Sequence, residues 1–193
     1  MFKLEEACAK LYTKHSFLFR IVNQTLREDD RSKLSSLGPF CYLLYTYVGN
    51  QPMKHVSRRY SRLQQMYSKE SLPIILYRGD CTTDEKIKEY REVAGQKDKY
   101  VKWLSFVSTS LDENVATTFS HNILYEIELN QHLSSDQFAY LESISYFQDE
   151  REVLLQPGVR FRVKKVYQLK SDEHVDRTRI RVTILPSFIW IRT

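Results

Sequence analysis

Residues 73–79 read PIILYRG and begin a series of short runs rich in β-branched and aromatic residues, a composition typical of strands. The later runs are WLSFVS (103–108), NILYEIEL (122–129), REVLL (151–155), VRFRVKKV (159–166) and RTRIRVTIL (177–185). Several of them alternate charged and apolar side chains, which is typical of strands with one buried face. Residues 73–193 are therefore predicted to form a mainly β region with an antiparallel or mixed sheet.

The residues before Pro73 follow a different pattern, in which apolar side chains recur at helical spacing. Phe17, Ile21 and Leu26 have this spacing, and so do the apolar residues between 40 and 48. Residues 1–72 are therefore predicted to form a helical lobe.

Two more helices are predicted inside the β region. Thr82 with Glu85, and Ser110 with Glu113, have the spacing of a capping box, and Gly95 would end the first of these helices. Helices first and sheet second indicate an α+β fold, and 193 residues are expected to form a single domain.

Composition excludes several kinds of site. Hydrophobic residues at 42% and charged residues at 27% are typical of a folded domain. No two of the five glycines have the spacing of a P-loop or a Rossmann fingerprint. The three cysteines form no CxxC pair and the five histidines form no HxxxH pair, so neither a disulfide framework nor a metal site is expected.

The charge of the chain indicates the kind of partner it would attract, and its hydropathy indicates where in the cell it would lie. The net charge of +5 is spread among acidic residues, which favours attraction to an acidic partner over nucleic-acid binding. The basic residues of 159–166 and 177–182 alternate with apolar ones, as expected of a hydrated strand face. No apolar run is long enough to span a bilayer, and no secretory signal is visible, which favours a cytoplasmic location.

Three motifs lie at or beside predicted strands: YRGD (77–80), SFVSTS (105–110) and DEREVLL (149–155). Arg78 offers a planar fork of donors that suits phosphate oxygens, although an arginine at a strand end can also pair with a carboxylate or reach solvent. Ser108 lies two residues before the predicted cap Ser110, so capping does not explain it and it is expected to orient another polar group.

Glu150 and Glu152 are two residues apart at the entry to a predicted strand. In extended chain both carboxylates would point to one face and raise each other's pKa. One interpretation is a solvated strand edge beside arginines, and the other is a site that stabilises positive charge, as carboxylates do around an oxocarbenium-like transition state.

The order of these motifs, an arginine, then S-T-S, then E-x-E, each at a strand, is more specific than any one of them. The sequence resembles the arginine-specific mono-ADP-ribosyltransferases of the R-S-E group, which includes clostridial actin-modifying toxins and vertebrate ecto-enzymes. The stretch LYTKHSFLFRIVNQTLRE (11–28), followed by ILYRGD (75–80), is also similar to the helical region that precedes the arginine in that family. The resemblance implies a helical N-terminal lobe packed on a split β-sandwich core that binds NAD without a Rossmann fold.

The resemblance also implies residue roles. Arg78, with Gly79 beside it, would bind the NAD phosphates, and Ser108 would hold the catalytic Glu152. Glu152 would contact the nicotinamide ribose and favour the oxocarbenium ion, while Glu150 would orient the incoming arginine of a protein acceptor.

Three aromatic residues near the motifs could either contact a ligand or belong to the core. By the resemblance, Phe119 would lie against the nicotinamide, and the loop SISYFQDE (143–150) would present Tyr146 and Phe147 to the protein substrate. The alternatives are a core position for Phe119 and a strand with buried rings for Tyr146 and Phe147.

The function implied by the resemblance is transfer of ADP-ribose from NAD to arginine of a protein acceptor, with release of nicotinamide and no metal. Two alternatives are an NAD glycohydrolase, in which water replaces arginine, and an inactive module that kept the fold. The presence of Glu150 favours transfer, and the three intact motifs disfavour an inactive module.

Overall fold

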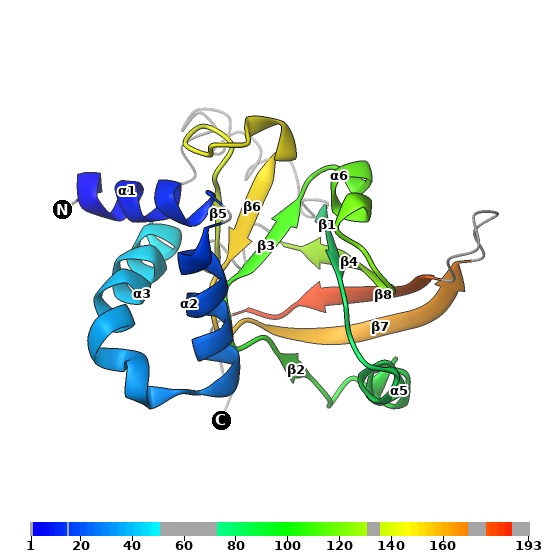
Figure 1. Cartoon of the computed structure of the whole chain (residues 1–193). Helices are drawn as coiled ribbons and strands as arrows, with labels where there is room; N and C mark the ends of the chain where they lie inside the picture. The colour runs from blue at the N-terminus through cyan, green and yellow to red at the C-terminus, as the bar shows by residue number, and fades with distance from the viewer. Residues whose placement is uncertain (1, 15, 51–72, 131–135, 170–176, 187–193) are drawn as a thin grey trace, which may run out of the picture.

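The computed structural model describes residues 2–14, 16–50, 73–130, 136–169 and 177–186 (Figure 1). Its N-terminal elements are α1 (Phe2–Tyr12), α2 (Phe17–Glu28), the 3₁₀ turn η1 (Arg31–Lys33) and α3 (Leu34–Gly49). These confirm the helical prediction up to residue 50, and the part of that prediction covering residues 51–72 lies outside the described residues. No helix in the described ranges has the length and apolar composition that a bilayer crossing requires.

In the described part of the chain, eight strands follow, with two helices and a 3₁₀ turn between them. The strands are β1 (Ile74–Asp80), β2 (Val101–Lys102), β3 (Val107–Ser110), β4 (Ile123–Leu129), β5 (Phe138–Tyr140), β6 (Glu152–Leu155), β7 (Arg160–Leu169) and β8 (Arg177–Ile184). The intervening helical elements are α5 (Asp84–Val93), α6 (Glu113–Thr118) and η2 (Gln148–Glu150). The α+β class is therefore confirmed, with the helices first and the sheet after them.

The strand order in the sheet is β2-β7-β8-β4-β1-β3-β6-β5, and β4 with β8 is the parallel pair among otherwise antiparallel neighbours. The sheet is weakly joined in the middle. β1 pairs with β4 along its whole length, from Ile74 to Asp80, whereas one residue pair, Tyr77 with Ser110, joins β1 to β3. We call this junction between β1 and β3 the seam. In Figure 1, β3 and β6 run across the direction of β7 and β8, so the seam divides the sheet into two differently oriented parts.

Burial along β6 shows how these parts pack. All four residues of β6 are buried, because successive side chains of a strand point to opposite faces and each face has a core. Val153 and Leu155 belong to the core that also contains residues of β1, β4, β7, β8 and α5. Leu154 belongs to the second core, with Tyr12, Val22 and other residues of the N-terminal helices. The three strands β3, β6 and β5 thus lie between the helical lobe and the rest of the sheet, which is the split sandwich expected.

Several boundaries differ from the prediction. The cap of α5 is Thr83, whose side chain accepts from Lys86 N, so the helix begins one residue later than the Thr82 capping box indicated. The cap of α6 is Asp112, whose side chain accepts from Asn114 N. Ser110 is the last residue of β3 instead, because it pairs with Tyr77 of β1 and Glu152 of β6, and its hydroxyl donates to the backbone oxygen of Glu150.

Candidate active site

A cavity of about 210 Å³ lies at the seam, between β1, β3, β6, α6 and the turn before β6. The site residues proposed from sequence that line it are Arg78, Gly79, Ser108, Phe119, Glu150 and Glu152. The structure therefore brings three motifs from distant parts of the sequence to one cavity, where β1, β3 and β6 converge.

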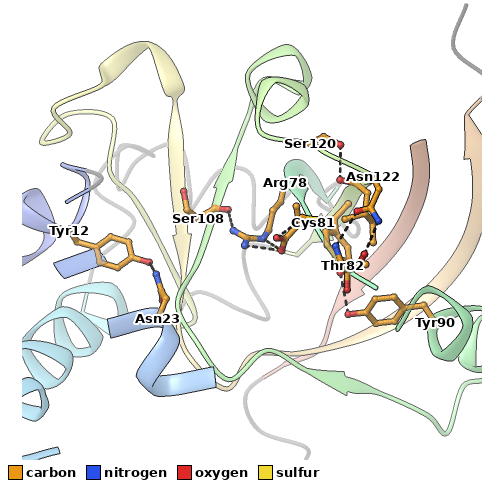
Figure 2. Close-up of polar contacts among 12 residues, drawn as sticks. Tyr12, Asn23, Arg78, Cys81, Thr82, Tyr90, Ser108, Ser120 and Asn122 are labelled. Carbon is orange, nitrogen blue, oxygen red and sulfur yellow. Dashed lines mark hydrogen bonds and ion pairs between the residues drawn. The ribbon is translucent and has the colours of Figure 1, made fainter. Parts of the chain in front are cut away.

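Arg78 bridges the seam. On its own strand, its Nε and Nη2 donate to Asp80 Oδ2 at 3.1 and 2.9 Å. Across the seam, its Nη1 donates to the backbone oxygen of Ser108 at 2.9 Å (Figure 2). A guanidinium carries five N–H groups, so these three bonds leave two for an anion in the cavity. Arg78 is thus paired with a carboxylate, as one interpretation of the sequence allowed, and also available to a ligand.

Glu152 is the buried acid of the site. Its side chain is 2% exposed, and Ser108 Oγ donates to Glu152 Oε1 at 2.6 Å. Its second oxygen, Oε2, is buried and accepts no hydrogen bond from any described residue. Burial raises the pKa of Glu152 to about 7, the bond from Ser108 opposes that shift, and the charge of Glu150 adds to it.

Glu150 does not lie on the strand, and the expectation of two carboxylates on one strand face is wrong. It belongs to η2, and Arg151 adopts a left-handed conformation with φ of 46° before β6 begins at Glu152. The chain turns between the two acids, so alternation along a strand does not apply to them. Glu150 still lines the cavity, because Ser110 Oγ donates to its backbone oxygen at 2.7 Å and holds the turn against β3. The raised pKa of Glu152 comes first from burial, and the neighbouring acid is a smaller cause.

Phe119 follows α6, lines the cavity and is 49% exposed, so the core alternative for this ring is wrong. Gly79 sets the position of this helix. A Cβ on Gly79 would lie less than 3 Å from backbone atoms of Ala116, Phe119 and Ser120. Glycine is required here by the close approach of α6 to β1, and that approach places Phe119 over the cavity.

One family of known proteins matches this chain from the end of α3 to just after β8. The sequence model of the ADP-ribosyltransferase exoenzymes matches residues 46–185, which is well over half of the chain. The chain belongs to this family. A sequence search of curated proteins gives no match.

Solved structures of ADP-ribosyltransferases have the same fold. The toxin Plx2a from Paenibacillus larvae superposes with a TM-score of 0.66 at 17% identity, over 94% of this chain and 85% of that one. Vis, a toxin of Vibrio splendidus whose structure in complex with agmatine is known, gives 0.66 at 17% identity, over 95% and 74%. An ADP-ribosyltransferase from Clostridium botulinum gives 0.58 at 17% identity, over 93% and 85%.

The two loop aromatics of this family member are exposed. Tyr146 is 52% and Phe147 is 45% exposed, in the turn between β5 and η2. The alternative of a strand with buried rings is therefore wrong. The backbone N–H of Tyr146 donates to Thr13 Oγ1 at 3.1 Å, so the end of α1 supports this turn.

Asp80 and Phe19 are among the residues of the site that the sequence prediction did not include. Asp80 was inside the YRGD motif, and the signal was available, since residues i and i+2 of a strand share a face and their charges are opposite. Phe19 of α2 also lines the cavity, and no local pattern indicates this, because it depends on how the helical lobe packs against β3 and β6. Within the described ranges, no group of three or more His, Cys, Asp or Glu side chains could hold a metal ion.

Proposed function

We propose that this member of the ADP-ribosyltransferase exoenzyme family transfers ADP-ribose from NAD to arginine side chains of a protein acceptor and releases nicotinamide. The observation that carries the proposal is Glu152, a buried carboxylate with one oxygen held by Ser108 and the other without a described partner, in a cavity shared with Arg78. Leaving a buried carboxylate oxygen without a donor costs free energy, so a ligand hydroxyl in the cavity is expected to supply one.

The residues that line the cavity fit NAD. The two remaining N–H groups of Arg78 suit oxygens of the pyrophosphate, because Asp80 and the Ser108 carbonyl fix the plane of the guanidinium. The exposed ring of Phe119 suits the flat nicotinamide, since aromatic rings gain by stacking in an offset arrangement. A ribose hydroxyl is the donor that suits Glu152 Oε2.

Glu152 acts on the bond that breaks. The bond between the ribose C1′ and the nicotinamide nitrogen breaks, and its electron pair leaves with nicotinamide. The positive charge that develops on the ribose is stabilised at short range by the ionised carboxylate of Glu152, which is itself buried. Ser108 fixes the orientation of this carboxylate, so the site does not reorganise during the reaction.

Glu150 acts on the acceptor. A new bond forms between a guanidinium nitrogen and C1′, and the guanidinium gives up one proton. Arginine has a pKa above 12, so a carboxylate beside it is needed to orient it and to accept that proton. Support for a guanidinium acceptor comes from Vis, which binds agmatine, a compound that carries the guanidinium of arginine.

The test is an incubation of the protein with labelled NAD and agmatine, and separately with poly-arginine, in which free nicotinamide and free ADP-ribose are counted. The expected result is label on both acceptors and nicotinamide release that exceeds free ADP-ribose. Release of nicotinamide with equal free ADP-ribose and no labelled acceptor would identify an NAD glycohydrolase. Neither release nor label would identify an inactive module, and either result overturns the proposal.

A further inference from the structure

The end of α1 is fixed against the turn that precedes η2. The link is Thr13, which is 1% exposed and lies just after α1. Its Oγ1 accepts the N–H of Tyr146 at 3.1 Å and donates to the backbone oxygen of Lys10 at 2.8 Å. A buried hydroxyl with both bonds satisfied is a specific contact, so α1 and the turn form one continuous surface.

Two lysines of that surface flank one exposed ring. Lys10 Nζ lies 5.3 Å from the centroid of the Tyr146 ring and Lys14 Nζ lies 5.7 Å from it. Both are within the range of a cation–π contact. Both side chains are exposed, and neither is among the ion pairs formed by the described residues. The result is a concentration of positive charge around an aromatic ring, with no acidic side chain of the described chain paired to it.

This surface lies beside the candidate active site. Tyr146 and Phe147 immediately precede η2, whose last residue, Glu150, lines the cavity. On the other side, the chain continues from Lys14 into α2, which contributes Phe19 to the cavity wall. We therefore expect an acceptor whose arginine reaches Glu150 to present neighbouring residues to the two aromatics and the two lysines.

We propose that Lys10, Lys14, Tyr146 and Phe147 form a docking surface for an acidic segment of the acceptor protein, so that the modified arginine has aspartate or glutamate close to it. The inference rests on the proposed function and specifies its acceptor. The argument for an acidic segment is charge complementarity. The acidic neighbours meet the lysines, while the arginine itself meets Glu150, so the acceptor matches a surface with positive charge at Lys10 and Lys14 and negative charge at the cavity. The net charge of +5 acts in the same direction at long range.

The experiment compares kcat/KM for four acceptors: agmatine and three peptides of equal length that carry one arginine flanked by aspartate, by asparagine or by lysine. The double variant Lys10→Glu with Lys14→Glu is tested beside the double variant Lys97→Glu with Lys99→Glu. The control changes net charge equally, at exposed positions between α5 and β2, which Figure 1 shows at the opposite end of the molecule from the turn before η2.

For the wild-type protein we expect the aspartate peptide to exceed the asparagine peptide by about tenfold at low salt, with the ratio falling as salt screens the charges. The Lys10/Lys14 variant should lose this preference while agmatine stays within about twofold, and the Lys97/Lys99 variant should keep it.

Each other outcome overturns a specific statement. If the aspartate and asparagine peptides are equal for the wild-type protein while agmatine is modified, the docking surface is wrong and the proposed function stands. If both double variants lose the preference equally, overall charge is responsible and the docking surface is wrong. If agmatine and all peptides remain unmodified, the proposed function is wrong and the acceptor inference falls with it.

Discussion

The candidate site has two parts that are held in different ways. Arg78, Ser108 and Glu152 lie on paired strands. Arg78 donates across the seam to the backbone oxygen of Ser108, and Ser108 donates to Glu152 between β3 and β6. Glu150, Tyr146 and Phe147 lie in a turn that is held by hydroxyl contacts from Ser110 and Thr13. Strands restrict a side chain to one direction, whereas a turn can vary in length and sequence. We infer that the strand part acts on NAD, where geometry must not change, and the turn part acts on the acceptor.

The largest expected effect comes from removing the charge of the strand part. Glu152→Gln should lower both arginine modification and NAD hydrolysis by about 100-fold or more, because the charge stabilises the transition state that both reactions share. NAD affinity, measured by calorimetry, should stay within about threefold. A variant that keeps more than half of either activity would remove Glu152 from the catalytic role.

A matched change in the turn part should separate the two reactions. Glu150→Gln should lower arginine modification by about 30-fold while NAD hydrolysis stays within about threefold, because water needs less orientation than a guanidinium. Asp149→Asn is the control, since Asp149 is the exposed neighbouring acid of the same turn and does not line the cavity. A parallel fall of both activities in Glu150→Gln would show that the division into two parts is wrong.

A smaller effect is expected from Arg78→Lys, which keeps the charge and removes the planar fork. Lysine cannot reach Asp80 and the Ser108 carbonyl together while still meeting a phosphate, so the Kd for NAD should rise about tenfold. Calorimetry measures the Kd, and a thermal melt shows whether losing the bond from Arg78 to the Ser108 carbonyl also destabilises the fold. An unchanged Kd would contradict the assignment of Arg78 to the NAD phosphates.

The last expected effect is on stability rather than activity, and it depends on pH. Burial places the pKa of Glu152 at about 7, above its ordinary value near 4.5, so the folded state binds more protons than the unfolded state between these values. The free energy of unfolding should therefore fall as pH rises from about 4.5 to 7. Glu152→Gln lacks this group, so its stability relative to the wild-type protein should rise between pH 5 and pH 8, by on the order of 2 kcal/mol, or roughly 4 to 8 °C in Tm.

Thermal melts at pH 5 and pH 8 test this stability effect. The Tm difference between Glu152→Gln and the wild-type protein should grow from the lower to the higher pH, and Glu150→Gln should not show the same growth. A difference that is equal at both pH values would mean that Glu152 is not buried as an uncompensated charge.

The sequence predicted most of the strand part, for a physical reason. Strands that begin or end on the same sheet edge bring their terminal side chains together, so the YRGD, S-T-S and E-x-E motifs could be expected to meet. Short apolar runs predicted β1, β4, β7 and β8 well. β3 was expected at 103–108 and lies at 107–110, because Trp103 and Leu104 are apolar residues of the segment that precedes the strand.

The turn part was harder to predict. The spacing of Glu150 and Glu152 indicated extended chain, and nothing in the letters D-E-R-E shows that Arg151 adopts a positive φ, since arginine rarely does. The exposure of Tyr146, Phe147 and Phe119 depends on the tertiary arrangement, because apolar rings beside predicted strands fit a core equally well. For the same reason the contribution of Phe19 became visible only with the packing of the helical lobe.

The left-handed Arg151 has an evolutionary consequence. It ends the turn that contains Glu150, and β6 begins at the next residue. We expect exchange of the exposed residues of this turn between related proteins to leave the pairing of β6 with β3 intact, whereas the buried Leu141 must keep its place in the core. Arg151 marks the place in the chain where such a graft can end.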